Sequence, residues 1–319
     1  MLQIDISDKL VWDDYFPHPD WETLRPALES QDPADRVQAQ DDIVRQWLDK
    51  LADIFPGHYR VAESDHHFLL CLNDFQHRAA LGLARECRGF LLRELPGISP
   101  LATKVPILIW HDRKTYYDYL ARFYPEGHHG ASSGVHIRHD CQHIVLWGKD
   151  LTSVDSTIAH ELTHEGLCIA DLPLWIEEGL AQIVEHDLTG RQLAPLTTKM
   201  AAIQKRYWRR FGLQAFWDGT AFGQASRVSE LAYQLAEVLL RLLLDDSRPR
   251  WFGLVRSHRP KLVGFLSTAS IADAGEAAAQ KHLSMTLTEL VARFLGPGDW
   301  APRPIDRGEI PPPALSNVG

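Results

Sequence analysis

The sequence is poor in cysteine. Its cysteines follow none of the spacings found in small domains that are held together by disulfide bonds. Only four occur in 319 residues, and no C-x-x-C pair is present. This pattern excludes a disulfide-dense scaffold and a cysteine-type zinc ribbon. The four, which lie far apart in the chain, are Cys71, Cys87, Cys141 and Cys168.

Long hydrophobic runs are missing as well. The longest apolar stretch covers residues 235–244, where Arg241 interrupts it, and it is too short to span a bilayer. The first residues of the chain are acidic where a secretion signal needs a basic start and an apolar core. We therefore expect a cytoplasmic protein, in a reducing compartment, with no membrane partner.

The chain also lacks an excess of positive charge. Lys and Arg total 33 against 42 Asp and Glu, which leaves a net charge of −9. This balance argues against nucleic acid or an anionic membrane as a partner. The hydrophobic fraction of 45% is ordinary for a globular protein, and the length allows about two structural units. Histidine is enriched, with 16 residues.

The order of predicted elements indicates the α+β class. Buried strands are expected within residues 66–72 and 105–110, with a helix over residues 75–95 between them. Residues 130–148 predict a hairpin, because apolar residues alternate on both sides of a polar turn. Almost everything from residue 151 to residue 295 has helical periodicity.

The most informative pattern is His160-Glu161-Leu162-Thr163-His164, which reads H-E-x-x-H. On an α-helix the two histidines lie on one face, one turn apart. Imidazoles at that spacing can converge on one Zn²⁺, and Glu161 then lies beside the water at the ion, where it can take a proton. The same spacing also arises by chance or from packing, so the prediction needs a third ligand.

Two arrangements supply a third ligand. The H-E-x-x-H-x-x-G-x-x-H pattern is excluded, because Leu167 and Ala170 occupy the positions of its glycine and third histidine. The other takes a glutamate from a following helix, predicted here over residues 174–186 after Pro173. The candidates on that helix are Glu177, Glu178 and Glu185.

The second helix carries Trp175-Ile176-Glu177-Glu178-Gly179-Leu180-Ala181, which resembles the W-[LI]-x-E-G-[LF]-A signature of the gluzincin metallopeptidases. The resemblance covers residues 157–185 and is closest to the compact bacterial peptidase MA-like domains. It implies that Glu178, immediately before the glycine, is the third zinc ligand beside His160 and His164. A helix-interior glycine costs stability, so Gly179 is expected where another helix or a metal site approaches closely.

The resemblance also implies a zincin-like fold, in which the zinc helix lies between a small mixed sheet lobe and a mainly helical lobe. The predicted parts are a helical N-terminal lead-in (residues 1–57), a single catalytic domain (58–296) and a Pro/Gly-rich tail (297–319) that is disordered or follows the surface. Within the domain we expect an α/β lobe (58–150), zinc-binding helices (151–187) and a helical lobe (188–296).

Two further roles depend on the resemblance. Residues 229–244 resemble the downstream Tyr-Gln helix of the peptidase MA-like group, which makes Tyr233 a candidate oxyanion donor; alternatively it is a buried tyrosine bonded elsewhere. The position where thermolysin-type enzymes carry an orienting Asp is Gln182, so Asp155 or Glu185 would have to orient the ligands instead. No G-x-M-E-N element precedes the zinc helix, which leaves exopeptidase action unsupported.

The remaining histidines and Cys168 have competing interpretations. A histidine cluster within residues 128–143 is either a second metal site, a rim that faces the substrate, or a solvated loop. Cys168 lies one turn beyond His164 and is either near the metal or a small buried hydrophobe. The cluster consists of His128, His129, His136, His139 and His143.

These observations predict a zinc-dependent hydrolase, a metallopeptidase that cleaves a peptide or protein substrate. His160, His164 and Glu178 would hold Zn²⁺, Glu161 would act as general base, and Tyr233 would assist. Two alternatives stay open: a non-catalytic zincin-fold binding or scaffold module, and a zinc amidase that acts on a non-peptide substrate.

Overall fold

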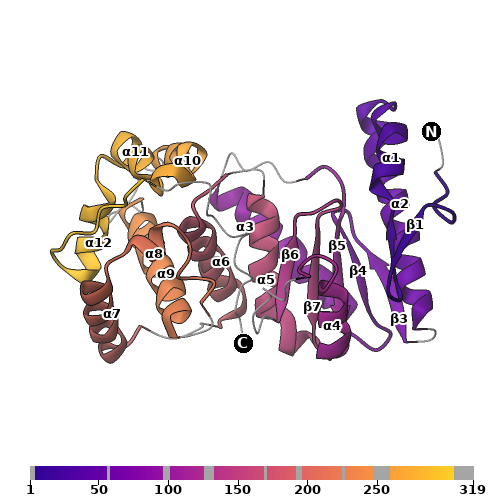
Figure 1. Cartoon of the computed structure of the whole chain (residues 1–319), viewed down its shortest axis with the longest axis horizontal. Coiled ribbons are helices and arrows are strands. Elements are labelled where there is room, and N and C mark those ends of the chain that lie inside the picture. Colours follow the sequence, from indigo (N-terminus) through magenta and orange to yellow (C-terminus); the bar gives the residue numbers. More distant parts are fainter. Residues whose placement is uncertain are drawn as a thin grey trace. The chain divides into compact units, whose positions relative to one another are not determined.

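The chain folds as an α+β protein, as its sequence predicts (Figure 1). It contains one five-stranded mixed sheet, a separate two-stranded hairpin and many helices. The computed structural model describes residues 4–55, 58–95, 101–125, 133–168, 171–191, 196–224, 227–247 and 259–304.

The five-stranded sheet has the order β3-β4-β5-β7-β6. β4, β5 and β7 are parallel to one another, and the edge strands β3 and β6 are antiparallel to their neighbours. The predicted hairpin is confirmed, because β6 pairs with β7 and Val135 lies opposite Val145. The strands are β3 (Tyr59–Glu63), β4 (His67–Leu72), β5 (Val105–Trp110), β6 (Gly134–Ile137) and β7 (His143–Trp147).

The central strands consist almost entirely of apolar residues, as is typical of strands that are buried along their whole length. Every residue of β5 is buried, as are the first five of β4. Helix α3 (His77–Glu94) follows β4, α4 (Arg113–Leu120) follows β5, and α5 (Leu151–Leu167) follows β7. Helix α5 begins at residue 151, and the Asp150 carboxylate caps it by accepting a hydrogen bond from the Ser153 amide at 2.9 Å.

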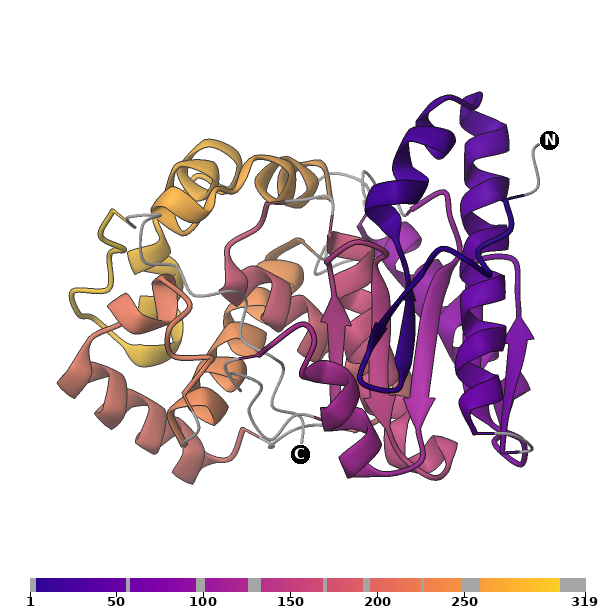
Figure 2. The same cartoon turned by 45° about the vertical axis from the view of Figure 1, so that its right-hand side comes forward.

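The N-terminal region packs onto the sheet unit. It contains the helices α1 (Trp21–Glu29) and α2 (Pro33–Ile54), and also a hairpin that the sequence did not predict, β1 (Leu10–Asp13) with β2 (Phe16–Pro19) (Figure 2). The buried Trp47 of α2 donates its indole N–H to the Pro17 carbonyl at 2.8 Å. The Asp41 carboxylate accepts the Lys104 amide at 2.9 Å, which links α2 to the start of β5.

The C-terminal part is helical within the described residues. Helices α6 and α9 pack closely at Gly179, where a Cβ atom would lie 2.7 Å from the Ala236 carbonyl oxygen. This confirms the expected close approach at that glycine. The helices are α6 (Leu174–Thr189), α7 (Thr198–Phe211), α8 (Gln214–Trp217), α9 (Arg227–Ser247), α10 (Arg259–Thr268), α11 (Glu276–Ala278) and α12 (Leu287–Leu295), with the short η1 (Ile271–Asp273) and η2 (Ala279–Leu283).

The start of the predicted tail follows the surface of the helical part. Trp300 is buried, donates its indole N–H to the Gly296 carbonyl at 2.8 Å and accepts the Trp217 indole N–H at 2.8 Å. The prediction for residues 305–319 lies outside the described residues.

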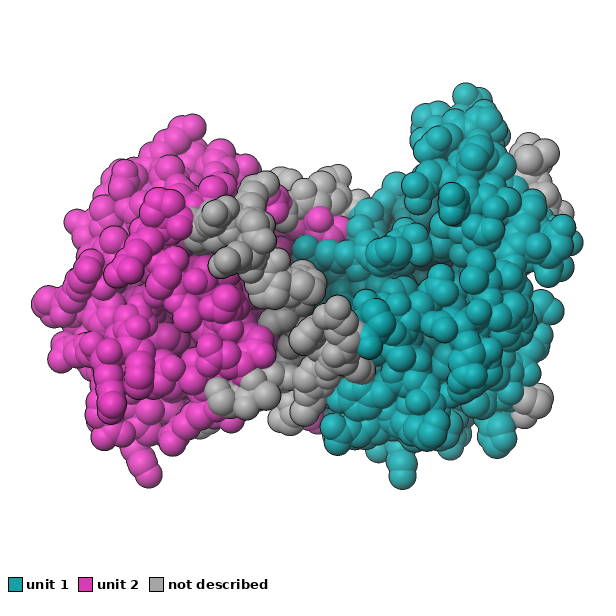
Figure 3. All heavy atoms as spheres, viewed as in Figure 1, with its two compact units in different colours: residues 1–87, 100–129, 133–165 teal, residues 88–99, 130–132, 166–319 magenta. Residues whose placement is uncertain are grey.

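The chain divides into two compact units (Figure 3). The first comprises residues 1–87, 100–129 and 133–165, and the second comprises residues 88–99, 130–132 and 166–319. The N-terminal lead-in therefore belongs to the same unit as the sheet. None of the helices in the described ranges is both long and apolar enough to cross a membrane.

Candidate metal centre

Helix α5 places His160 and His164 on one face, one turn apart. The two side chains are 0% and 7% exposed. Val154, Ile158 and Leu162, which are apolar residues of the same helix, are all buried as well. The helix is thus held in the interior, and its histidines are shielded from bulk water.

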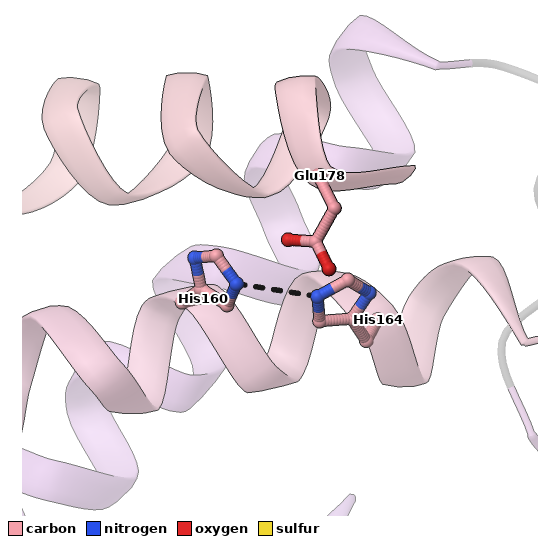
Figure 4. Close-up of side chains that lie close together, drawn as sticks. All are labelled: His160, His164 and Glu178. Atoms are coloured by element: carbon pink, nitrogen blue, oxygen red, sulfur yellow. Dashed lines mark hydrogen bonds between the residues drawn. The ribbon is translucent and has the colours of Figure 1, made fainter. Parts of the chain in front are cut away.

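Glu178, on the first half of α6, completes a group of three potential ligands. One ligand atom of each residue lies within 4.8 Å of the others, and all three residues are buried. The carboxylate of Glu178 points toward the two imidazoles (Figure 4). The structure therefore brings together the three residues that the sequence predicted as metal ligands.

The distance between the imidazoles fits a bound ion. The Nε2 atoms of His160 and His164 are 3.2 Å apart, drawn as a dashed line in Figure 4. Two nitrogens that bind one zinc ion at ~2.0–2.1 Å in tetrahedral geometry lie about 3.3 Å apart. Two nitrogens and one carboxylate oxygen are also a common donor set for catalytic zinc. The residues present therefore fit a divalent cation.

The surroundings are unusually rich in buried carboxylates. A carboxylate is rarely buried without a cation or several hydrogen bonds, because loss of hydration is expensive. A divalent cation at the His-His-Glu group offsets part of that cost for Glu178. The buried glutamates of α5 and α6, each at most 4% exposed, are Glu161, Glu165, Glu177, Glu178 and Glu185.

Glu161, the predicted base, lies on α5 next to the first ligand and faces the edge strand β6. A Cβ atom on Gly134 would lie 3.4 Å from the Glu161 Cγ and 2.4 Å from the Thr157 Cγ2. Burial, together with the charge of Glu161, raises the pKa of Tyr124 to about 12. Tyr124 is therefore a protonated phenol within electrostatic reach of the base, and no motif in the sequence singled it out.

His136 is the histidine of the predicted cluster that the fold brings to α5. It stands two residues after Gly134 on β6, and side chains at that spacing share a face of the strand. The ring is buried, and neither nitrogen makes a hydrogen bond of good geometry within the described residues. Burial lowers the pKa of His136 well below its usual value, and Arg138 and His164 lower it further. The Gln142 side chain is close enough to raise the pKa of His136 slightly.

Of the other described histidines of the cluster, His143 lies in the core and His139 on the surface. His143 is buried, with Nε2 2.8 Å from the Tyr119 hydroxyl and Nδ1 2.7 Å from the Cys141 carbonyl oxygen. His139 is exposed and pairs with Asp140 at 3.0 Å. The described residues contain no second group of metal-ligand atoms. His128 and His129 lie outside the described residues.

Tyr233 is buried in α9, and its ring packs edge-on against Phe222 with centroids 5.2 Å apart. It lies one turn before Ala236, the residue that α9 places against Gly179. Tyr233 is therefore near the α6 turn that carries Glu178. Its role as an oxyanion donor stays a prediction.

The candidates for orienting the ligands, Asp155 and Glu185, and the Gln182 that replaces the usual Asp are side chains of α5 and α6, and their orienting role stays a prediction. Gln182 and Glu185 are 4% and 3% exposed, whereas Asp155 is half-buried. Cys168 is half-buried just beyond α5 and is not part of the group of ligand atoms found among the described residues. The alternative of Cys168 as a ligand therefore has no support from the geometry.

Comparison of the chain with protein-family models, with curated proteins and with solved structures found no significant match. The resemblance to gluzincins consequently rests on the residues of the two motifs and on the geometry described above.

Proposed function

We propose that this chain is a zinc-dependent hydrolase of the gluzincin type, a metallopeptidase with a zincin-like fold. The observation that carries the proposal is the buried His160, His164 and Glu178 group with Glu161 next to it on the same helix. A purely structural metal site needs ligands but no base beside them. The presence of Glu161 therefore favours catalysis.

In this proposal His160, His164 and Glu178 hold the ion, which, when bound, supplies Lewis-acid polarisation and lowers the pKa of water. Glu161 accepts the proton of the attacking water and later delivers it to the leaving amine. The low exposure of the four residues keeps the site dry, which strengthens each electrostatic interaction within it.

Charge that develops on the carbonyl oxygen of the substrate needs a hydrogen-bond donor. Tyr233 is the donor that the family resemblance implies. We include His136 as a second substrate-facing group, because it lies on the α5 side of β6 and its buried ring has only the weak contact with the Gln142 side chain within the described structure. A bound substrate would supply a stronger partner.

The proposed substrate is a peptide or protein, and the proposed location is the cytoplasm. All four cysteines are free thiols. Burial raises the pKa of Cys71, Cys87 and Cys141 to about 12, so these thiols are unreactive. Such a set of cysteines suits a reducing compartment.

Metal analysis of the purified full chain is the first test. Wild-type protein is expected to contain about one zinc per chain, and His160→Ala much less than that. His139→Ala, which alters an exposed histidine outside the group, is the control and should keep its zinc. A wild type without stoichiometric zinc, or a His160→Ala protein with as much zinc as the wild type, rules out the site.

Cleavage of a peptide library, with and without a chelator, separates the proposal from its two alternatives. Chelator-sensitive peptide cleavage supports the peptidase. Bound zinc without turnover of peptides or of other amides identifies a scaffold module. Turnover confined to non-peptide amides identifies an amidase, since both reactions use the same activation of water.

A further inference from the structure

Helix α7 carries a row of cations on its solvent side. The opposite side of the helix contains Gln204 and Trp208, which are buried in the second unit. The cations recur at intervals of three, four and seven residues, so that they form one exposed stripe. This basic face consists of Lys199, Lys205, Arg206, Arg209 and Arg210, all of them exposed.

The basic face contrasts with the rest of the chain. Residues 188–217 contain six Lys and Arg and no Asp or Glu, in a chain whose net charge is −9. The remaining residues therefore carry a net charge of −15. Two pairs on α7, Lys205 with Arg209 and Arg206 with Arg210, repel each other at i,i+4 spacing, which destabilises the helix. An ordinary solvated helix face alternates the sign of its charges and avoids that repulsion.

Nothing within the described structure neutralises these charges. None of the five cations forms an ion pair with a carboxylate of the described residues, and Arg209 donates only to the Leu295 carbonyl oxygen, at 3.3 Å. Four of the cations and the small residue Ala202 line a shallow open hollow. Arg209 and Arg210 lie in the last turn of α7, where cations interact favourably with the helix dipole. Lys199 lies in the first turn, where a cation is unfavourable, so the dipole does not explain its presence.

We propose that the basic face of α7 is a docking surface for an acidic peptide segment of a partner protein. The inference stands on charge complementarity and is independent of the metal centre. The face is about 17 Å long at 1.5 Å per residue. An extended segment of about five or six residues covers that length.

Two other polyanions fit the face less well. A membrane-bound helix buries an apolar side in the lipid, but the large apolar residues of α7 are already buried or half-buried in the protein, and Phe211, 63% exposed, is the one exception. Single-stranded nucleic acid stacks its bases on open aromatic rings. The ring of Phe211 is engaged by Tyr207, 4.8 Å away, and by the Arg210 guanidinium, 5.2 Å away.

The size of the ligand also distinguishes these classes. A long nucleic acid or a membrane plane would extend beyond α7 over the rest of the second unit, which carries a net charge of −4 outside residues 188–217. A short peptide stays within the stripe, and screening over ~8 Å at physiological salt limits repulsion from more distant charges.

Fluorescence anisotropy with the full chain and a labelled peptide of six consecutive glutamates tests the proposal. We expect saturable binding at about 50 mM salt that weakens at least about fivefold at about 300 mM, as screening predicts. The double variant Lys205→Glu/Arg209→Glu should bind at least about tenfold more weakly. The control Arg85→Glu/Lys281→Glu makes the same change in net charge at exposed positions outside α7 and should stay within about twofold of wild type.

Several outcomes overturn the proposal: no saturable binding of the peptide, an equal loss in both double variants, or tighter binding of an oligouridylate or of phosphatidylserine vesicles than of the peptide. Charge reversal could unfold α7, so the neutral variant Lys205→Gln/Arg209→Gln is also tested, because glutamine is a good helix former. It should also weaken binding while the circular dichroism spectrum stays that of the wild type.

Discussion

The Nε2 atoms of His160 and His164 face each other at 3.2 Å in the interior of the protein. Without an ion, one Nε2 must carry the hydrogen and the other must accept the bond, so the two neutral rings hold different tautomers. With an ion, both nitrogens are lone-pair donors. The buried Glu178 carboxylate beside them makes the second state electrostatically favourable.

The third ligand can be tested by comparing neighbouring glutamates. Glu178→Gln should weaken zinc binding by about 10–100-fold or more, because an amide oxygen is a poorer ligand than a carboxylate. Glu177→Gln changes an adjacent, equally buried residue outside the ligand group and should leave zinc affinity nearly unchanged. Competition with a chromophoric chelator measures both affinities. If Glu177→Gln shows the larger loss, the assignment of the ligand is wrong.

Glu161→Gln separates metal binding from catalysis. The variant should keep about one zinc per chain, and its kcat/KM on a cleaved peptide should fall about 10²–10⁴-fold, since only the proton acceptor is removed. Metal content and initial rates on the same preparation provide the measurement. Residual turnover close to that of the wild type would show that Glu161 is not the base.

His136→Leu should change activity and stability in opposite directions. A buried ring that makes no hydrogen bond of good geometry and only a weak contact with Gln142 is costly, so its replacement should leave the free energy of unfolding unchanged or raise it by about 1 kcal/mol. Peptide hydrolysis should fall about 10²-fold, as for loss of one oxyanion donor, with zinc retained. Urea unfolding and steady-state kinetics report the two effects.

His143→Leu is the matched control for that pair of measurements. It removes a buried imidazole that bonds to Tyr119 and to the Cys141 carbonyl, so it should lower the free energy of unfolding by about 2–3 kcal/mol. If His136→Leu destabilises the protein to the same extent, His136 is a core residue and its assignment as a substrate-facing group fails.

Gly179→Ala should be strongly destabilising. The new methyl group would lie 2.7 Å from the Ala236 carbonyl oxygen, and backbone cannot move aside cheaply, so we expect a loss of about 1–3 kcal/mol in the free energy of unfolding. Gly82→Ala is the control in α3, where nothing lies within 4 Å, and it should stabilise by about 0.5–1 kcal/mol. Thermal or urea unfolding of the two variants should show opposite signs.

The free energy of unfolding should decrease at acidic pH because His143 is harder to protonate in the folded protein than in the unfolded chain. Burial lowers the pKa of His143 from 6.5 to about 4, whereas the unfolded chain protonates at the ordinary value. The unfolded state therefore binds more protons between pH 6.5 and 4, and stability falls as the pH falls through that range, by up to about 3 kcal/mol. Above pH 6.5 the contribution is fully retained.

The measurement is urea unfolding of metal-free protein at several pH values. His143→Gln removes the titrating group, so its free energy of unfolding should depend less on pH than that of the wild type. The difference between the two proteins should narrow as the pH falls. If the free energy of unfolding depends on pH in the same way in both proteins, His143 is not the source of the loss of stability at low pH.

The sequence by itself determined the local parts of this protein. A four-residue spacing puts His160 and His164 on one face in any α-helix, and alternation of apolar residues sets the pairing of β6 with β7. The helix-interior Gly179 indicated the close approach that α9 makes at Ala236. These inferences hold because helix and strand geometry repeat with fixed periods.

Only the tertiary structure decided which distant residues meet. His136 and His143 look alike in the sequence, yet His136 faces α5 with only a weak contact to Gln142, while His143 is a core residue with two close hydrogen bonds. Tyr124 came near Glu161, and the β1–β2 hairpin formed, without a sequence signal. Such outcomes depend on how β6 and the N-terminal region pack against other elements, and packing between segments far apart in the chain leaves no periodic trace in the sequence.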